Sequence, residues 1–111
     1  LSHQALFDVA STSSGQCWSL STYCPVPGPV PAAPSNNDYR PGFAAALMLK
    51  DLTLAAEAAR EAGAAAPMGA MARELYARFG AENGGRDFSA VVEALREGWL
   101  ATPAARPEGT A

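Results

Sequence analysis

The chain has 111 residues, a formal net charge of -3, and hydrophobic residues at 49% of its positions. This length and composition suffice for one domain with one modest core. The acidic balance leaves no basic patch for nucleic acid, and no uninterrupted apolar run is long enough to span a membrane. Two cysteines, Cys17 and Cys24, are too few for a disulfide framework, so we expect a protein of the reducing cytoplasm.

The first predicted element is a short helix over residues 2–10, with Ser2 as its N-cap. Small polar residues and Gly15 should end it. His3 is the only histidine and has no cysteine pair nearby, so we expect it at the surface and predict no metal site.

A long irregular segment follows, over residues 16–39. Trp18 and Tyr23 are five residues apart, so on a helical turn they would diverge, and each is expected to anchor the segment to the core. Five prolines from Pro25 to Pro34 exclude a regular helix. A segment of this kind is usually functional or disordered, and its interleaved apolar residues indicate that it packs against the domain.

A central helix is predicted to begin at Phe43 and to end at Gly63. Because its apolar residues surround the whole helical wheel, we interpret it as a buried helix. Within it stand the opposite charges Lys50 and Asp51, whose burial would be costly without partners. They form a structural ion pair, or the lysine reaches the surface at the helix edge, or the pair belongs to a ligand site.

Two more helices are predicted after the central one. The first covers residues 67–79, with Met68 and Met71 turned toward the core, and the second covers residues 87–98, with Asp87 as its cap.

The predicted fold class is therefore all-α, a small bundle of about four helices with a long proline-rich loop. Residues 1–100 form the domain, and residues 101–111 lack periodicity and are expected to be a flexible tail. The sequence contains no pairing of nucleophile and base and no glycine-rich phosphate loop, so we predict no catalytic residue within it.

Several motifs in a fixed order carry a resemblance to a known family. They are Ser13-Ser14-Gly15-Gln16-Cys17-Trp18-Ser19, Thr22-Tyr23-Cys24-Pro25-Val26-Pro27-Gly28, Asn36-Asn37-Asp38-Tyr39, Gly42-Phe43, Leu47-Met48, Lys50-Asp51-Leu52, Leu54-Ala55 and Asp87-Phe88-Ser89. The set resembles the carboxy-terminal domain of the 3-hydroxyisobutyrate dehydrogenases, in the β-hydroxyacid dehydrogenase family. The implied fold is like the carboxy-terminal domain of 6-phosphogluconate dehydrogenase.

The resemblance implies a two-domain enzyme, in which a Rossmann domain binds the dinucleotide and a helical domain closes over the substrate. Such enzymes oxidise 3-hydroxyisobutyrate to methylmalonate semialdehyde with NAD in valine breakdown. By this resemblance Lys50 contacts the cofactor, and Trp18, Tyr23, Phe43 and Asp51 line the substrate pocket.

The family's phosphate-binding glycines, its substrate-carboxylate segment and its catalytic lysine have no counterpart in this sequence. We therefore expect an incomplete domain whose partner is the missing Rossmann domain, with no dehydrogenase activity alone and a tendency to form homo-oligomers. NADP is not excluded as the cofactor. The alternatives are a tartronate or succinate semialdehyde reductase of the same family, or a non-catalytic helical module used for dimerisation or partner binding.

Overall fold

The computed structural model describes residues 1–99, and the predicted tail lies outside these residues. The described part contains helices and no strand, so the all-α prediction is confirmed. Its elements are α1 (His3–Ala10), α2 (Trp18–Ser21), η1 (Pro34–Asn36), α3 (Ala45–Ala62), α4 (Pro67–Asn83), η2 (Phe88–Ala90) and α5 (Val91–Arg96), where η denotes a short 3-10 helix. None of the described helices is long and apolar enough to cross a bilayer.

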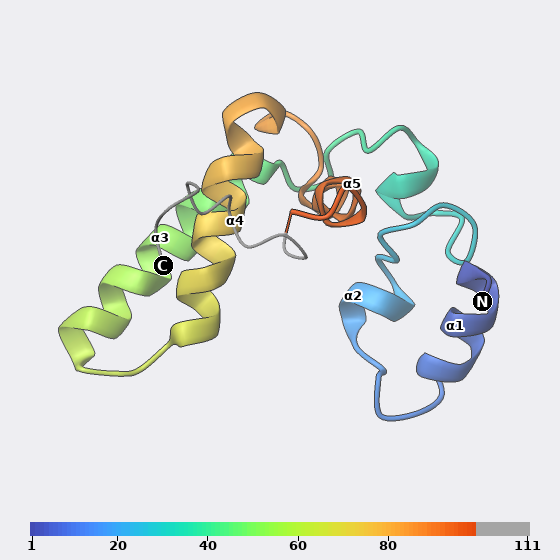
Figure 1. Ribbon diagram of the computed structural model, residues 1–111, viewed down its shortest axis with the longest axis horizontal. Helices are drawn as coiled ribbons and strands as arrows, with labels where there is room; N and C mark the ends of the chain where they lie inside the picture. The colour runs from blue at the N-terminus through green and yellow to red at the C-terminus, as the bar shows by residue number, and fades with distance from the viewer. Residues whose placement is uncertain (100–111) are drawn as a thin grey trace, which may run out of the picture.

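The helices form two groups on either side of α5 (Figure 1). The long helices α3 and α4 lie side by side, while α1, α2 and the proline-rich loop lie together on the other side. The N-terminal prediction is confirmed, because the Oγ of Ser2 accepts a hydrogen bond of 3.1 Å from the backbone N–H of Ala5.

Helix α3 ends as predicted at Gly63, which adopts a left-handed conformation with a φ of 67°. The prediction that this helix is buried was wrong. Ala45 is its one buried residue, and Lys50 and Asp51 are both exposed. One face of α3 packs against α4 and η2, whereas Leu47 and Leu54, which had made the opposite face look equally apolar, are 47% and 53% exposed.

Helix α4 begins at Pro67 as predicted and continues about one turn past Phe79 to Asn83. Phe79 is buried, but Met68 and Met71 are 86% and 65% exposed, so their predicted inward orientation was wrong. The core meets α4 near its C-terminal end, and Met68 lies about 16 Å from Phe79 along the helix axis. The methionines are therefore too far from the core to contribute to it.

A small aromatic and alanine core joins the helices. Its buried members are Tyr39, Ala45, Tyr76, Phe79, Ala90 and Ala94. The hydroxyl of Tyr76 donates a hydrogen bond of 2.9 Å to the carbonyl of Phe88, and burial raises the pKa of Tyr76 to about 12. This bond fixes η2 against α4.

The proline-rich loop is packed down, as its apolar residues predicted. The hydroxyl of Tyr39 donates to the carbonyl of Pro25 at 2.7 Å, and the hydroxyl of Ser35 donates to the carbonyl of Cys24 at 2.9 Å. The acceptors Cys24 and Pro25 lie at the start of the loop and the donors Ser35 and Tyr39 lie near its end, so the two bonds hold the ends of the loop together. Both Cys17 and Cys24 are free thiols.

Candidate functional site

The site is built around a stack of aromatic rings from three segments. The rings of Trp18 and Tyr23 stack with centroids 4.9 Å apart, and Tyr23 stacks on Phe88 at 5.2 Å. Phe43 meets Phe88 edge to face at 5.9 Å. The prediction that Trp18 and Tyr23 diverge was wrong, because α2 ends at Ser21 and the chain leaves the helix before Tyr23.

These rings border a hollow of about 400 Å³, which we call the aromatic hollow. Its walls are Trp18, Tyr23, Gly42, Phe43, Met48 and Phe88. Three of the four residues expected to bind substrate, namely Trp18, Tyr23 and Phe43, thus lie around one space. Trp18 is 60% exposed, so it forms an outer wall of the hollow and is not the core anchor predicted for it. A volume of this order can hold a small organic molecule.

Lys50 and Asp51 are not among the walls of the aromatic hollow. They lie on the exposed face of α3, and the interpretation of the pair as a buried ion pair was wrong. Lys50 follows the wall residue Met48 by two positions in α3, and because successive residues are about 100° apart around a helix, it lies on nearly the opposite side of α3 from Met48. The exposed side chain of Lys50 therefore lies on the side of α3 away from the aromatic hollow.

Asp87 lies behind the aromatic hollow and is fully buried. One of its carboxylate oxygens accepts hydrogen bonds from the Tyr23 hydroxyl at 2.6 Å and from the backbone N–H groups of Gly42 and Phe43 at 2.9 and 3.0 Å. The other oxygen accepts from the N–H and hydroxyl of Ser89, so the predicted capping role is confirmed.

These hydrogen bonds set the charge states of both partners. Burial alone would raise the pKa of Asp87, but the hydrogen bonds from Ser89, Tyr23 and the backbone outweigh it and hold that pKa below its usual range. Burial, together with the hydrogen bond to Asp87, raises the pKa of Tyr23 well above its ordinary value. Tyr23 is therefore neutral near pH 7. Because its hydroxyl donates a hydrogen bond to Asp87, Tyr23 is unsuited to act as an acid or base toward a ligand.

Sequence reasoning missed the wall residues Gly42, Met48 and Phe88, and it gave Asp87 a capping role alone. The motifs Gly42-Phe43, Leu47-Met48 and Asp87-Phe88-Ser89 were part of the family resemblance, and they were the available signal. Proximity of the last motif to Tyr23, which precedes it by 64 residues, is a property of the fold that no local pattern encodes.

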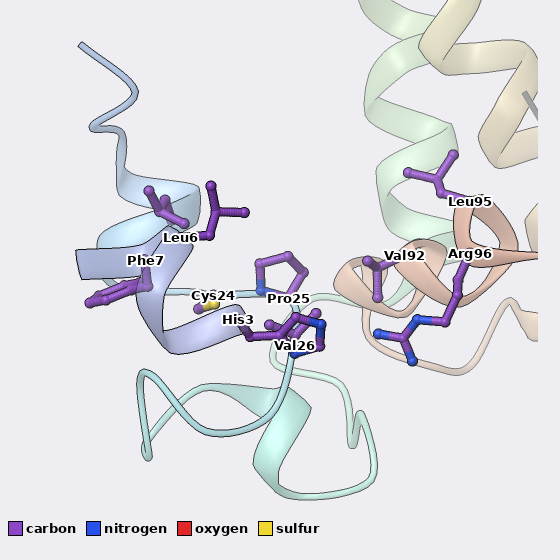
Figure 2. A pocket seen from close by; sticks show the side chains of 10 residues that line it. His3, Leu6, Phe7, Cys24, Pro25, Val26, Val92, Leu95 and Arg96 are labelled. Carbon is purple, nitrogen blue, oxygen red and sulfur yellow. The ribbon is translucent and has the colours of Figure 1, made fainter. Parts of the chain in front are cut away.

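A second hollow, of about 420 Å³, lies between α1 and α5, and we call it the apolar groove. Figure 2 shows side chains of α1 on one side of it and Val92, Leu95 and Arg96 of α5 on the other. Apart from His3 and Arg96, its lining is apolar or a cysteine, so it lacks the converging polar groups of a catalytic site. Within residues 1–99, no group of acidic, histidine or cysteine side chains is arranged to hold a metal ion.

Comparison with known proteins identifies the family to which this chain belongs. The family model described as the NAD-binding domain of NADP-dependent 3-hydroxyisobutyrate dehydrogenase matches residues 1–95. The chain belongs to this family of 3-hydroxyisobutyrate dehydrogenases.

Individual relatives carry the same name. Probable 3-hydroxyisobutyrate dehydrogenases of Mycobacterium bovis and Mycobacterium tuberculosis are 54% identical over 96 residues, which is 86% of this chain and 33% of theirs. The human mitochondrial 3-hydroxyisobutyrate dehydrogenase is 40% identical over 98 residues, which cover 87% of this chain and 29% of the human protein. This chain therefore spans about a third of the length of the relatives it matches.

A solved structure extends the similarity to three dimensions. The 3-hydroxyisobutyrate dehydrogenase of Mycobacterium tuberculosis, determined with L-serine, superposes with a TM-score of 0.84 at 54% identity. The superposition covers 86% of this chain and 33% of that one. The helical fold described above therefore corresponds to about a third of that mycobacterial enzyme.

Proposed function

We propose that this chain is the carboxy-terminal, substrate-facing domain of an NAD-dependent 3-hydroxyisobutyrate dehydrogenase. The complete enzyme would oxidise 3-hydroxyisobutyrate to methylmalonate semialdehyde in valine breakdown. The observation that supports this most is the aromatic hollow, where Trp18, Tyr23 and Phe43 meet in a chain that belongs to this family. The chain alone would be inactive, because it has no phosphate-binding loop and no catalytic lysine.

The chemistry of the hollow favours a small 3-hydroxy acid. Its walls are aromatic and aliphatic, so they suit the methyl branch of 3-hydroxyisobutyrate. L-serine, present in the mycobacterial structure, is itself a 3-hydroxy acid of similar size. The walls offer no positive charge, so the substrate carboxylate would be bound by the rest of the enzyme.

The exposed position of Lys50 supports its proposed contact with the cofactor. A dinucleotide held by a Rossmann domain would approach α3 from outside this chain, and an exposed ammonium group on that helix fits such an approach. The nicotinamide of that cofactor would supply the hydride acceptor. We propose NAD, with NADP as the alternative that the description of the family keeps open. Asp51, next to Lys50, would face the substrate side.

The proposed partners are a Rossmann domain and further copies of the same protein. Exposed apolar side chains on α1, such as Leu6 and Val9, support an association of this kind. We propose the cytoplasm as the compartment, and the free thiols of Cys17 and Cys24 suit its reducing conditions.

Steady-state kinetics of the complete enzyme test the proposed roles. The variants are Lys50→Ala and Asp51→Ala, and Glu57→Ala is a matched control, since Glu57 is an exposed charged residue of the same helix. We expect Lys50→Ala to raise the KM for NAD, Asp51→Ala to raise the KM for the acid, and Glu57→Ala to change neither. Unchanged kinetics in the first two variants would refute both assignments.

Activity measured with several small substrates distinguishes the proposed function from its alternatives. Activity on tartronate or succinate semialdehyde in the reductive direction, without activity on 3-hydroxyisobutyrate, would keep the family and change the substrate. Inactivity on every small 3-hydroxy acid would favour a non-catalytic helical module, a role with which the apolar groove is compatible.

A further inference from the structure

The carboxylate of Asp87 connects three segments that are distant in sequence. Its five hydrogen bonds come from the hydroxyl of Tyr23, from the turn that precedes α3, and from Ser89 in η2. The backbone of the same segment adds to this connection, because the N–H of Asp87 donates to the carbonyl of Tyr39 at 2.8 Å and the N–H of Phe88 donates to that of Phe43 at 2.8 Å.

Each of the three segments contributes a wall to the aromatic hollow. Tyr23 forms one wall, Gly42 and Phe43 form the next, and Phe88, which follows Asp87 directly, forms the third. Asp87 is not itself a wall and cannot touch a molecule in the hollow. Any influence it has on such a molecule must therefore act through the residues it holds.

Tyr23 is the wall most dependent on Asp87. Its ring stacks between Trp18 and Phe88. Its hydroxyl donates one hydrogen bond among the described residues, and the acceptor is Asp87. A hydrogen bond to an ionised carboxylate is shorter and stronger than a neutral one, and the 2.6 Å distance is typical of that class. Loss of this bond would leave the Tyr23 ring held by its two stacking contacts alone, and we expect the ring to shift and the width of the hollow to change.

We propose that Asp87 is the positioning residue of the aromatic hollow, which fixes the Tyr23 ring and the Gly42–Phe43 turn at the spacing that a small branched 3-hydroxy acid requires. This inference rests on the proposed function, because the occupant is the substrate assigned there. It adds to that function a residue that determines substrate fit without contacting the substrate.

Kinetics of the complete enzyme distinguish positioning from a merely structural role. Asp87→Asn places an amide N–H₂ against groups that are themselves donors, and Tyr23→Phe removes one donor while keeping the ring. We expect the KM for 3-hydroxyisobutyrate to rise about tenfold or more in Asp87→Asn and by a smaller factor in Tyr23→Phe, while the KM for NAD stays within about twofold. If both KM values stay constant and the maximal rate alone falls, the inference is wrong.

Glu93→Gln is the matched control. Glu93 forms an ion pair of 2.7 Å with Arg86, the neighbour of Asp87, and it lies outside the walls of the hollow. This variant perturbs the same segment without touching the hydrogen bonds of Asp87, so both KM values should stay unchanged. If Asp87→Asn does not fold, Tyr23→Phe decides the question, because it leaves the buried carboxylate in place.

Trp18 fluorescence provides a readout that needs no turnover. In the isolated 111-residue chain, which has two tryptophans, Trp99→Phe leaves Trp18 as the single reporter of the stack. In that background, Tyr23→Phe and Asp87→Asn should shift the Trp18 emission, and Glu93→Gln should leave it unchanged. Unshifted emission in both variants would overturn the inference, whereas a wild-type enzyme inactive on every 3-hydroxy acid would overturn the proposed function instead.

Discussion

At the residue scale, the buried carboxylate of Asp87 makes the stability of the chain depend on pH. Hydrogen bonds lower its folded-state pKa below the ordinary value of 3.8. A group with a depressed folded pKa contributes its full stabilisation above the unfolded-state pKa, and that stabilisation is lost as the pH falls through the folded pKa.

Urea unfolding of the chain at several pH values measures this contribution. We expect Asp87→Asn to reduce the free energy of unfolding by roughly 1–3 kcal/mol above about pH 5, and the difference from wild type to shrink at lower pH. A difference that is the same at acidic and neutral pH would contradict the assignment of an ionised, hydrogen-bonded Asp87.

Gly42 lies where two segments pass very close together. A Cβ atom at this position would lie 2.7 Å from the hydroxyl oxygen of Tyr23, so a side chain there must displace the tyrosine or the turn. We expect Gly42→Ala to destabilise the chain by about 1–3 kcal/mol in thermal unfolding and to disturb the Tyr23 stack.

Gly80→Ala is the matched control for Gly42→Ala. Gly80 lies in α4, and a Cβ atom there would meet nothing within 4 Å. Because alanine is the better helix former, this variant should be neutral or more stable by up to about 1 kcal/mol. Equal destabilisation by the two variants would refute the steric explanation.

At the scale of secondary-structure elements, the packing of α4 is concentrated near its C-terminal end. Phe79 is 2% exposed, and its ring meets Tyr76 and Trp99 edge to face. We expect Phe79→Ala to lower the free energy of unfolding by about 3–5 kcal/mol, whereas Met71→Ala, at an exposed position of the same helix, should cost less than about 0.5 kcal/mol. Similar losses in both variants would mean that the methionine also lies in the core.

The elements themselves could be predicted from sequence, because their signals are local. Ser2 marks the start of α1, Pro67 marks the start of α4, and Gly63 marks the end of α3, and the structure confirms all three. Which face of a helix is buried depends on its neighbours. In α3 leucines occupy both faces, including the exposed Leu47 and Leu54, so periodicity could not reveal that Lys50 and Asp51 are exposed.

Most residues of the candidate site were predicted from the family resemblance, and few were predicted from the spacing and chemistry of neighbouring residues. The resemblance named Trp18, Tyr23 and Phe43, which the fold places around one hollow. Spacing along the chain predicted that Trp18 and Tyr23 diverge, since it could not foresee the end of α2 at Ser21. The contact of Tyr23 with Asp87 depends on tertiary structure and was not predictable from either segment alone.

At the scale of the whole molecule, exposed apolar side chains beside the apolar groove favour self-association of the chain. Leu6 is 54% exposed on α1, and Leu95 is 40% exposed on the facing α5. We expect sedimentation velocity to show dimers or larger species whose proportion rises with concentration.

Leu6→Lys should reduce this association, because it places a charge at the edge of the groove. Leu54→Lys is the matched control, since Leu54 has a similar exposure of 53% but lies on α3, away from the groove. A clean monomer in the wild type would contradict the expectation of self-association. An effect of Leu54→Lys alone would assign the association to α3.

We propose above that this chain is the substrate-facing domain of a 3-hydroxyacid dehydrogenase that needs a Rossmann domain to act. Formation of NADH from 3-hydroxyisobutyrate, measured for the complete enzyme and for the 111-residue chain, tests it most directly. We predict turnover by the complete enzyme, a marked loss in its Trp18→Ala variant, and no turnover by the chain alone. Turnover by the isolated chain, or inactivity of the complete protein on every small 3-hydroxy acid, would contradict the proposed function.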